Sequence, residues 1–412
     1  KVKRRFGTAC VLLWLFLGLI SGCAQKDSAV GSDLAPGLND VFPQEIWLYS
    51  TATHFFSTSV TTGSSPFLYL GHTQGYNADA LLKFNPYSSL PDSFQADSLV
   101  VKLFLDSLIS KEAVEQAVSV YFVNRSQTWN EIGVTWNNLD SLQLGDPISE
   151  FVVSSAAADS DSVSFQLPSP DSLLHAWVSA GSGDKTLHFN NGIYLLSDKN
   201  IDFMSRFASA ENGSVLLRPK LEMYIRAFEV DTTESGGYAQ IDTMLFLYAG
   251  ADAWIADDFG DPDPAYLYLG NGAAYRSFLL FDLENLLPAY GVAVQRAEIV
   301  LHADTVNSAN LGRISSAFYL AMADTSWIED PENASTQATS PVISNYNSTT
   351  ARLTLNLNEI AYDWIRNPGT NQGVMVKSTN EFYDLSRTVF YGTEAPDSLR
   401  PCLRLVYLVG RP

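Results

Sequence analysis

Basic residues, histidine and cysteine are all scarce in this sequence of 412 residues. Only 25 Lys and Arg stand against 45 Asp and Glu, which gives a formal net charge of −20. A chain this acidic repels phosphate backbones, which excludes nucleic acid as its main partner. Charged residues make up only 17% of the chain and hydrophobic residues 46%. Enough apolar surface is therefore present to fold, and a disordered acidic tail is excluded.

Long hydrophobic runs are absent except for one short segment near the start, at residues 9–20. The run follows four basic residues and is too short for a comfortable transmembrane helix, as is typical of a secretory signal. It ends in Leu19-Ile20-Ser21-Gly22-Cys23, which resembles the bacterial lipobox, whose cysteine carries the lipid; an ordinary signal with a chance cysteine is the alternative. We expect a lipoprotein signal peptide at 1–22, lipidation of Cys23, and a flexible tether at 23–44. The localisation expected is the bacterial cell envelope, at the outer membrane.

Cysteine usage is consistent with this expectation. Of the three cysteines, Cys10 leaves with the signal and Cys23 is lipidated, so Cys402 remains alone. The mature chain is therefore predicted to have no disulfide and no cysteine metal site. Cys402 lies in an alternating apolar run and is expected to be a small core residue.

The remainder of the chain repeats once. Trp47-Leu48-Tyr49 aligns with Phe246-Leu247-Tyr248, and Leu68-Tyr69-Leu70-Gly71 aligns with Leu267-Tyr268-Leu269-Gly270, both at an offset of 199. Ordered matches of this kind are typical of internal duplication. They predict two homologous domains, 45–227 and 243–408, joined by a linker at 228–242.

Each copy has a strand-like pattern. Short alternating or β-branched runs such as 118–123 and 352–357 are separated by clusters of Gly, Pro, Asn and Asp. Only residues 169–178 and 358–365 have helical spacing of apolar residues. The pattern predicts an all-β protein of two tandem jelly-roll-like β-sandwich domains, each with one short helix.

Several motifs occur in the same order in each copy. Among them are Leu81-Leu-Lys-Phe84, the segment from Thr128 to Asn137, and Leu217-Arg-Pro-Lys-Leu221. Together they resemble the DNRLRE-type domain, which overlaps an alginate-binding family of carbohydrate-binding modules. The resemblance implies a jelly-roll-like sandwich attached to a secreted or cell-surface protein, and polysaccharide as the ligand, more readily for the first copy.

Tryptophans beside polar residues are the candidate ligand-binding side chains, because sugar rings stack on aromatic faces while Asn and Glu bind hydroxyls. The candidates are Trp129, Glu131 and Trp136 in the first copy and Trp327 in the second. The alternative is that the tryptophans anchor loops to the core.

An acidic loop offers hard oxygen ligands, which Ca²⁺ prefers. Its candidate metal ligands are Asp257, Asp258, Asp261 and Asp263. The spacing is not that of an EF-hand, so a solvated turn is the alternative, and no other cofactor is expected.

Enzyme motifs are lacking, since the five histidines have no metal-ligand spacing and no nucleophile elbow is present. The sequence predicts a non-catalytic surface lipoprotein that binds polysaccharide or extracellular matrix and contacts the membrane through its lipid anchor only. A structural or adhesive protein that makes protein contacts is the alternative, and a polysaccharide-degrading enzyme is a third hypothesis.

Overall fold

The computed structural model describes residues 41–85, 93–110, 115–123, 129–141, 144–155, 161–177, 191–231, 237–258, 262–283, 292–308 and 314–410. The expected signal peptide and Cys23 lie outside these residues, as does most of the expected tether. No helix in the part of the chain that the structure describes is long and apolar enough to cross a membrane.

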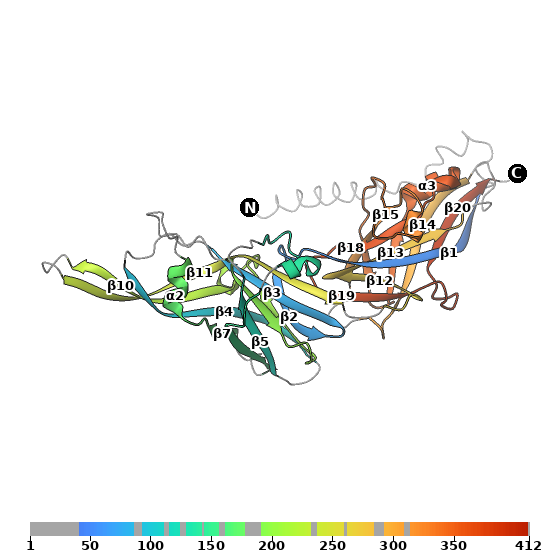
Figure 1. Cartoon of the computed structure of the whole chain (residues 1–412). Helices are drawn as coiled ribbons and strands as arrows, with labels where there is room; N and C mark the ends of the chain where they lie inside the picture. Colours follow the sequence, from blue (N-terminus) through green and yellow to red (C-terminus); the bar gives the residue numbers. More distant parts are fainter. Residues whose placement is uncertain are drawn as a thin grey trace, which may run out of the picture.

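The fold is an all-β sandwich, as predicted, and its strands form two sets that lie end to end (Figure 1). The set that we call the first body surrounds a large core that includes Tyr69, Phe207 and Trp254. Its strands are β2 (Phe67–Thr73), β3 (Tyr76–Phe84), β4 (Phe94–Ser110), β5 (Glu115–Phe122), β6 (Ser149–Ser154), β7 (Ser162–Gln166), β8 (Ile193–Ser197), β9 (Phe203–Ala208), β10 (Lys220–Asp231) and β11 (Gly237–Asp258).

The second body surrounds a separate core that includes Leu279, Tyr319 and Phe390. Its strands are β1 (Val41–Ser59), β12 (Tyr266–Asn271), β13 (Ala273–Phe281), β14 (Val292–Asp304), β15 (Ser316–Ala321), β16 (Ser344–Asn347), β17 (Arg352–Asn356), β18 (Val374–Ser378), β19 (Ser386–Tyr391) and β20 (Cys402–Gly410). Cys402 is buried with a free thiol, as predicted for a small core residue.

Each body carries one short α-helix, which confirms the prediction from apolar spacing. Helix α2 (Pro170–Trp177) begins at a proline, whose missing N–H costs nothing in the first turn, and it packs beside β4. Helix α3 (Asn358–Arg366) buries Ala361 and Trp364 and packs beside β14.

Long strands cross from one layer of the sandwich to the other at β-bulges. β1 pairs with β20 through residues 41–49 and with β13 through residues 50–59, and its register shifts between Ser50 and Ala52. β11 does the same with β10 and β3, and its register shifts between Ala249 and Ala251. A Cβ at Gly250, inside this second shift, would lie 1.9 Å from the Asn85 side chain, so a larger residue there requires Asn85 to move.

The first strand of each sequence copy belongs to the other body. β1 begins the first copy but pairs only with strands of the second body, and β11 begins the second copy but pairs with β10 and β3 of the first body. Because Trp47-Leu48-Tyr49 aligns with Phe246-Leu247-Tyr248, β1 and β11 hold equivalent positions. The two copies therefore exchange their first strands within one chain. Residues 45–59 and 243–258, which the repeat assigns to the first and second domains, lie in the second and first bodies.

One step of this path is local. β10 ends at Asp231 and β11 begins at Gly237, so the two strands form a hairpin, and closing so short a connection costs little conformational entropy. The pairing of β1 with β13 and β20 is in contrast a long-range one. Once β11 fills its position in the first body, β1 is left to fill the equivalent position in the second.

Candidate functional site

Two of the predicted ligand-binding tryptophans are core residues. Trp129 is 8% exposed and its indole N–H donates to the Asn191 carbonyl at 2.8 Å. Trp327 is fully buried, donates to the Gln372 carbonyl at 2.9 Å, and stacks on Phe278 with centroids 5.2 Å apart. Neither ring has a free face, so the prediction that these residues stack on a ligand is wrong and they anchor loops instead.

Trp136 has a different environment. It begins a short 3-10 helix (Trp136–Ser141), is partly buried, and lies 4.6 Å from the Lys199 ammonium, a cation–π distance. Lys199 also lines a shallow pocket of about 490 Å³ together with Glu150, Asp198 and other polar residues. Trp136 therefore lies next to a residue that lines a hollow in the surface.

Glu131 belongs to an acidic cluster in which Asp252 is buried, Glu131 is partly buried and Glu211 is exposed. The Glu131 carboxylate lies with those of Glu211 and Asp252, with one oxygen of each within 4.8 Å of the others. Glu131 Oε1 accepts the Asp252 N–H at 3.1 Å, and Asp252 Oδ2 accepts the Ala210 N–H at 2.6 Å. Strand exchange makes this cluster, because β11 carries Asp252 from the second copy to loops of the first.

The electrostatics of the cluster favour protonation. Burial, then the Glu211 charge, raises the pKa of Asp252 well above its ordinary value. Burial and the Glu131 charge raise the pKa of Glu211. Ca²⁺ takes six to eight oxygens, whereas three side chains converge here and two of them accept backbone N–H groups. The three carboxylates meet at the seam between the copies, where burial and mutual repulsion favour the protonated form of Asp252.

The acidic loop predicted as a metal site is not assembled among the described residues. Asp257 and Asp258 are the last residues of β11, and Asp261 lies outside the described residues. Asp263 accepts the Ala265 N–H at 2.9 Å, as in a solvated turn. In the part of the chain that is described, the group of carboxylates close enough for one cation is the Glu131 cluster.

Exposed aromatic rings instead line the outer face of β1. Trp47 is 46% exposed and Tyr49 is 36% exposed. Two residues apart on one strand, they point to the same side about 7 Å apart. We call this pair, with Glu45 on the same strand and Arg404 opposite Trp47 on β20, the second-body platform.

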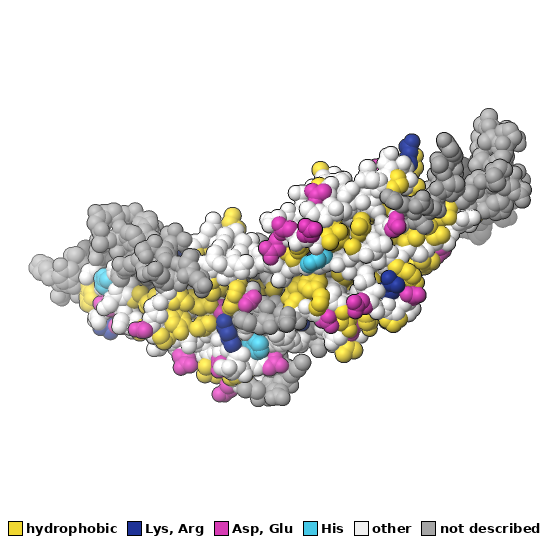
Figure 2. All heavy atoms as spheres, turned by 45° about the vertical axis from the view of Figure 1, so that its right-hand side comes forward, with side chains coloured by type: hydrophobic (Ala, Val, Ile, Leu, Met, Phe, Trp, Pro, Cys, Tyr) yellow, Lys and Arg dark blue, Asp and Glu magenta, His cyan; other side chains and the backbone are white. Residues whose placement is uncertain are grey.

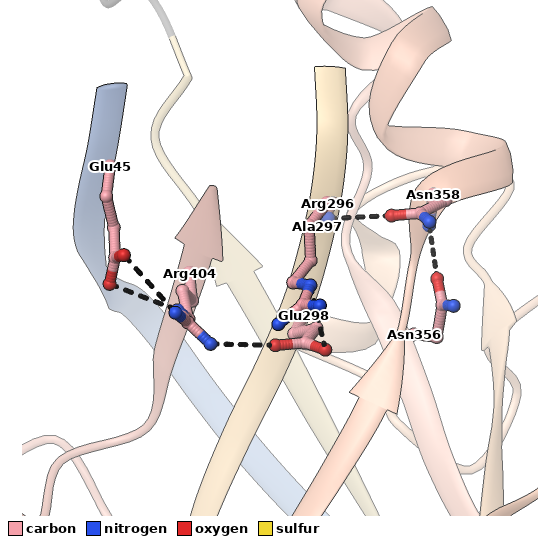
Figure 3. Close-up of polar contacts among 7 residues, drawn as sticks. All are labelled: Glu45, Arg296, Ala297, Glu298, Asn356, Asn358 and Arg404. Carbon is pink, nitrogen blue, oxygen red and sulfur yellow. Dashed lines mark hydrogen bonds and ion pairs between the residues drawn. The ribbon is translucent and has the colours of Figure 1, made fainter. Parts of the chain in front are cut away.

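Charged groups fix the polar side chains of this platform (Figure 3). Arg404 donates from Nε to Glu45 at 3.1 Å and from a terminal nitrogen to Glu298 at 3.4 Å, and its guanidinium carbon lies 5.5 Å from the Trp47 ring centre. The hydrogen bond from Arg404 holds the pKa of Glu45 below its usual range. Arg400 lies 4.7 Å from the Tyr49 ring. The platform thus presents two oriented rings beside pre-ordered hydrogen-bonding groups.

The first body has an aromatic face in the equivalent place. Phe246 on β11 is 48% exposed and packs edge-on against Tyr248, with centroids 5.5 Å apart. The ammonium of Lys220, on β10, lies 5.7 Å from the Phe246 ring and 5.8 Å from Phe104. We call this set the first-body platform. Hydrophobic side chains are exposed on both halves of the molecule in Figure 2.

Neither platform is predicted from the sequence as a binding surface, although the residues of both are aligned in the repeat. The two aromatic–Leu–aromatic motifs established the duplication, and their alternation already places the aromatic rings opposite the buried leucine. The informative signal was that two copies keep large aromatic residues at positions that alternate with the core.

Comparisons with known proteins identify no family. No family model matches the chain, and no curated protein matches it. Solved structures with a weak likeness include the Macrobrachium rosenbergii nodavirus, at 8% identity over 87% of this chain and 90% of that one with a TM-score of 0.16. Another is the infectious bursal disease virus Gt strain, at 11% identity over 90% and 78% with a TM-score of 0.14. Scores this low carry no argument, and the resemblance to the DNRLRE-type domain stays a prediction.

Proposed function

We propose that this protein is a non-catalytic, lipid-anchored surface protein that binds polysaccharide through its two platforms. The observation that carries the proposal is the pair of aromatic rows at equivalent positions of the two bodies: the exposed Trp47 and Tyr49, and the exposed Phe246 with the partly buried Tyr248. The basic start, the short apolar run and the lipobox-like Cys23 support the anchor at the envelope, at the outer membrane.

Physical chemistry favours a sugar on such a surface. The C–H-rich face of a pyranose ring can stack on an exposed aromatic ring, and neighbouring Arg and Glu groups bind hydroxyls. Arg404, the cross-strand partner of Trp47, is ion-paired with Glu45, so these two charged side chains lose little conformational freedom on binding. Two platforms on one rigid chain also raise the retention of a long polymer above that of either alone.

The test is retention of the full chain on a panel of insoluble polysaccharides, with and without Ca²⁺. Trp47→Ala and Phe246→Ala should each weaken retention several-fold, and the double variant should abolish it because both sites are lost. Tyr362→Ala is the matched control, since Tyr362 is an equally exposed aromatic residue on α3, outside both platforms. If no polysaccharide retains the wild-type chain, or if the double variant is retained equally well, the proposal is wrong.

One observation favours the adhesive alternative. Tyr224 and Met244 form an exposed cross-strand pair on β10 and β11, on the same face as Phe246, and they extend the first-body platform into an apolar patch. Patches of this kind also mark protein contacts. Capture of a protein partner that Phe246→Ala and Met244→Ala both prevent, together with failure to bind glycans, would favour this function.

A further inference from the structure

Two lysines lie directly opposite each other on the outer face of the first body. Lys220 on β10 pairs with Lys102 on β4, and both residues are partly buried. Like charges directly opposite each other destabilise a sheet. The chain has 45 acidic and only 25 basic residues, so two of its few cations lie where they repel each other. An anion bound between them would remove this repulsion.

Aromatic rings hold both ammonium groups. Lys102 Nζ lies 5.4 Å from the centre of the Phe104 ring, and Lys220 Nζ lies 5.8 Å from the same centre. Lys220 Nζ also lies 5.7 Å from the centre of the Phe246 ring. All three are cation–π distances. The two ammonium groups therefore lie around one ring, and an anion that binds there loses little affinity to the ordering of the lysine side chains.

The local charge of this face is positive by one. The Lys220 ammonium approaches the Glu222 carboxylate at 2.9 Å. Two rows of residues cross strands β11, β10, β4 and β7 at this point: Tyr248, Lys220, Lys102 and Ser164 in one row, and Phe246, Glu222, Val100 and Gln166 in the next. The charged residues of these rows are two lysines and one glutamate. An anion of a single charge would therefore balance the face.

The first of these rows forms a track across the sheet. Neighbouring strands are about 4.8 Å apart, so a row over four strands extends about 14 Å. Tyr248 lies at one end of the row, the exposed Ser164 lies at the other, and the two lysines lie between them. A sugar ring stacked at the aromatic end therefore places its own substituents beside the two cations.

The cations of the second-body platform are already neutralised. Arg404 forms ion pairs with Glu45 at 3.1 Å and with Glu298 at 3.4 Å. Arg296 approaches Glu298 at 3.7 Å. These two cations and two carboxylates balance, so this platform offers no net attraction to an anion. The two platforms thus differ in the charge of the sugar that they favour.

The charge and the type of donor together favour a sulfate ester at the lysine pair. Lysine binds oxyanions as a point charge, whereas the fork of arginine is the better match for a planar carboxylate. A phosphate monoester carries a charge of about −1.5 to −2 near neutral pH, which exceeds the single positive charge of this face. A sulfate ester carries one negative charge, and its three terminal oxygens can accept hydrogen bonds from ammonium groups on two strands at once.

We propose that the first-body platform binds a sulfate ester carried by the polysaccharide, between Lys102 and Lys220, while the second-body platform binds an uncharged stretch of the same polymer. The inference rests on the proposed function, because it names the class of polysaccharide that the two platforms retain. The sugar that carries the sulfate stacks on Phe246 and Tyr248, and its sulfate oxygens accept hydrogen bonds from the two ammonium groups.

The experiment compares retention of the full chain on beads that carry dextran with retention on beads that carry dextran sulfate. A chain with a net charge of −20 is repelled by a polyanion as a whole, so retention on dextran sulfate requires a local site. We expect retention to be at least about tenfold stronger on dextran sulfate, because each ammonium group adds a charge-assisted hydrogen bond.

Variants locate the site. Lys102→Gln and Lys220→Gln should each weaken retention on dextran sulfate at least about fivefold, because one charge-assisted hydrogen bond is lost. Lys102→Arg keeps the charge and should preserve retention. Lys83→Gln is the matched control, since it removes the same charge from β3, outside both platforms, and it should leave retention unchanged.

Equal retention on the two kinds of bead overturns the inference, as does a loss with Lys83→Gln as large as that with Lys102→Gln. Equal retention on alginate, a polyuronate, with the same dependence on the lysines would show that a carboxylate suffices and would also refute it. If a neutral polysaccharide retains the chain through Trp47 and Phe246 while dextran sulfate does not, this inference is wrong and the proposed function stands. If no polysaccharide retains the chain, both are wrong.

Discussion

Strand exchange predicts which cysteine pair can form a disulfide. Tyr49 on β1 lies directly opposite Cys402 on β20. The neighbouring pair is hydrogen-bonded through the Ser50 N–H and the Pro401 carbonyl, so Tyr49 and Cys402 form a non-hydrogen-bonded pair. Such pairs have Cα atoms about 4.5 Å apart, within the range of disulfides. Tyr49→Cys, in a chain with Cys10 and Cys23 replaced by serine, should therefore form one intramolecular disulfide with Cys402.

The expected stabilisation is large. The bond closes a loop of 402 − 49 = 353 residues, for which the chain-entropy relation gives roughly 6 kcal/mol, while measured disulfides deliver up to about 5 kcal/mol. Unfolding of the second body should shift upward by about 10 °C or more. Burial raises the pKa of the Cys402 thiol to about 11, so oxidation with diamide is done near pH 9.

Thiol counting with a maleimide after denaturation provides the assay, and Tyr248→Cys is the matched control. Tyr248 is the equivalent residue on β11, where it faces Lys220, so this variant should keep two free thiols. If the copies did not exchange strands, β11 would lie beside β20, and Tyr248→Cys would oxidise while Tyr49→Cys would not. That outcome would refute the exchange, and a disulfide-linked dimer of Tyr49→Cys would place the exchange between two chains.

Two further predictions concern the seam between the copies. Trp254 is fully buried on β11, and its ring centroid lies 4.8 Å from that of Tyr69. Trp254→Ala should lower the free energy of unfolding by roughly 3–5 kcal/mol. Amide hydrogen exchange should then be faster in β2 and β3 than in the wild type, and unchanged protection of these strands would contradict the prediction. Asp252 has a raised pKa in the fold, so its contribution to stability is fully present below the pKa of the unfolded chain and is lost as pH rises through the folded value. Asp252→Asn should therefore have a higher melting temperature than the wild type at pH 8 and the same melting temperature near pH 3. Asp397→Asn, an exposed control, should leave the melting temperature unchanged at both pH values. A lower melting temperature for Asp252→Asn at pH 8 would show that the carboxylate is needed in its charged form.

Local patterns in the sequence predicted the local structure well. Alternating runs became strands, and Pro170 and the apolar spacing around Trp364 placed the two helices. The offset of 199 correctly paired residues that occupy equivalent positions, as Leu68 and Leu267 show by pairing with Phe207 and Phe390. These features depend on neighbours in the chain or within one copy.

The exchange and the site could not be predicted in the same way. A repeat specifies that β1 and β11 fit equivalent positions, but it does not specify which body each one enters. The tryptophans failed as site predictors because Trp129 and Trp327 satisfy their indole N–H groups with loop carbonyls, a contact made only in the folded chain. Glu131 meets Asp252 only because a strand of the other copy passes beside it.

The exchanged strands also decide how the molecule carries force. Each body is closed by a strand that continues directly into the other body, through residues 60–66 and 259–265. Pulling the bodies apart must therefore slide β1 or β11 along its two partners and break both hydrogen-bonded ladders together, as in shear, and cannot simply straighten a linker. A load that enters at residue 41 passes first into β1 and β20, so the strand that carries Trp47 and Tyr49 is the first to bear it.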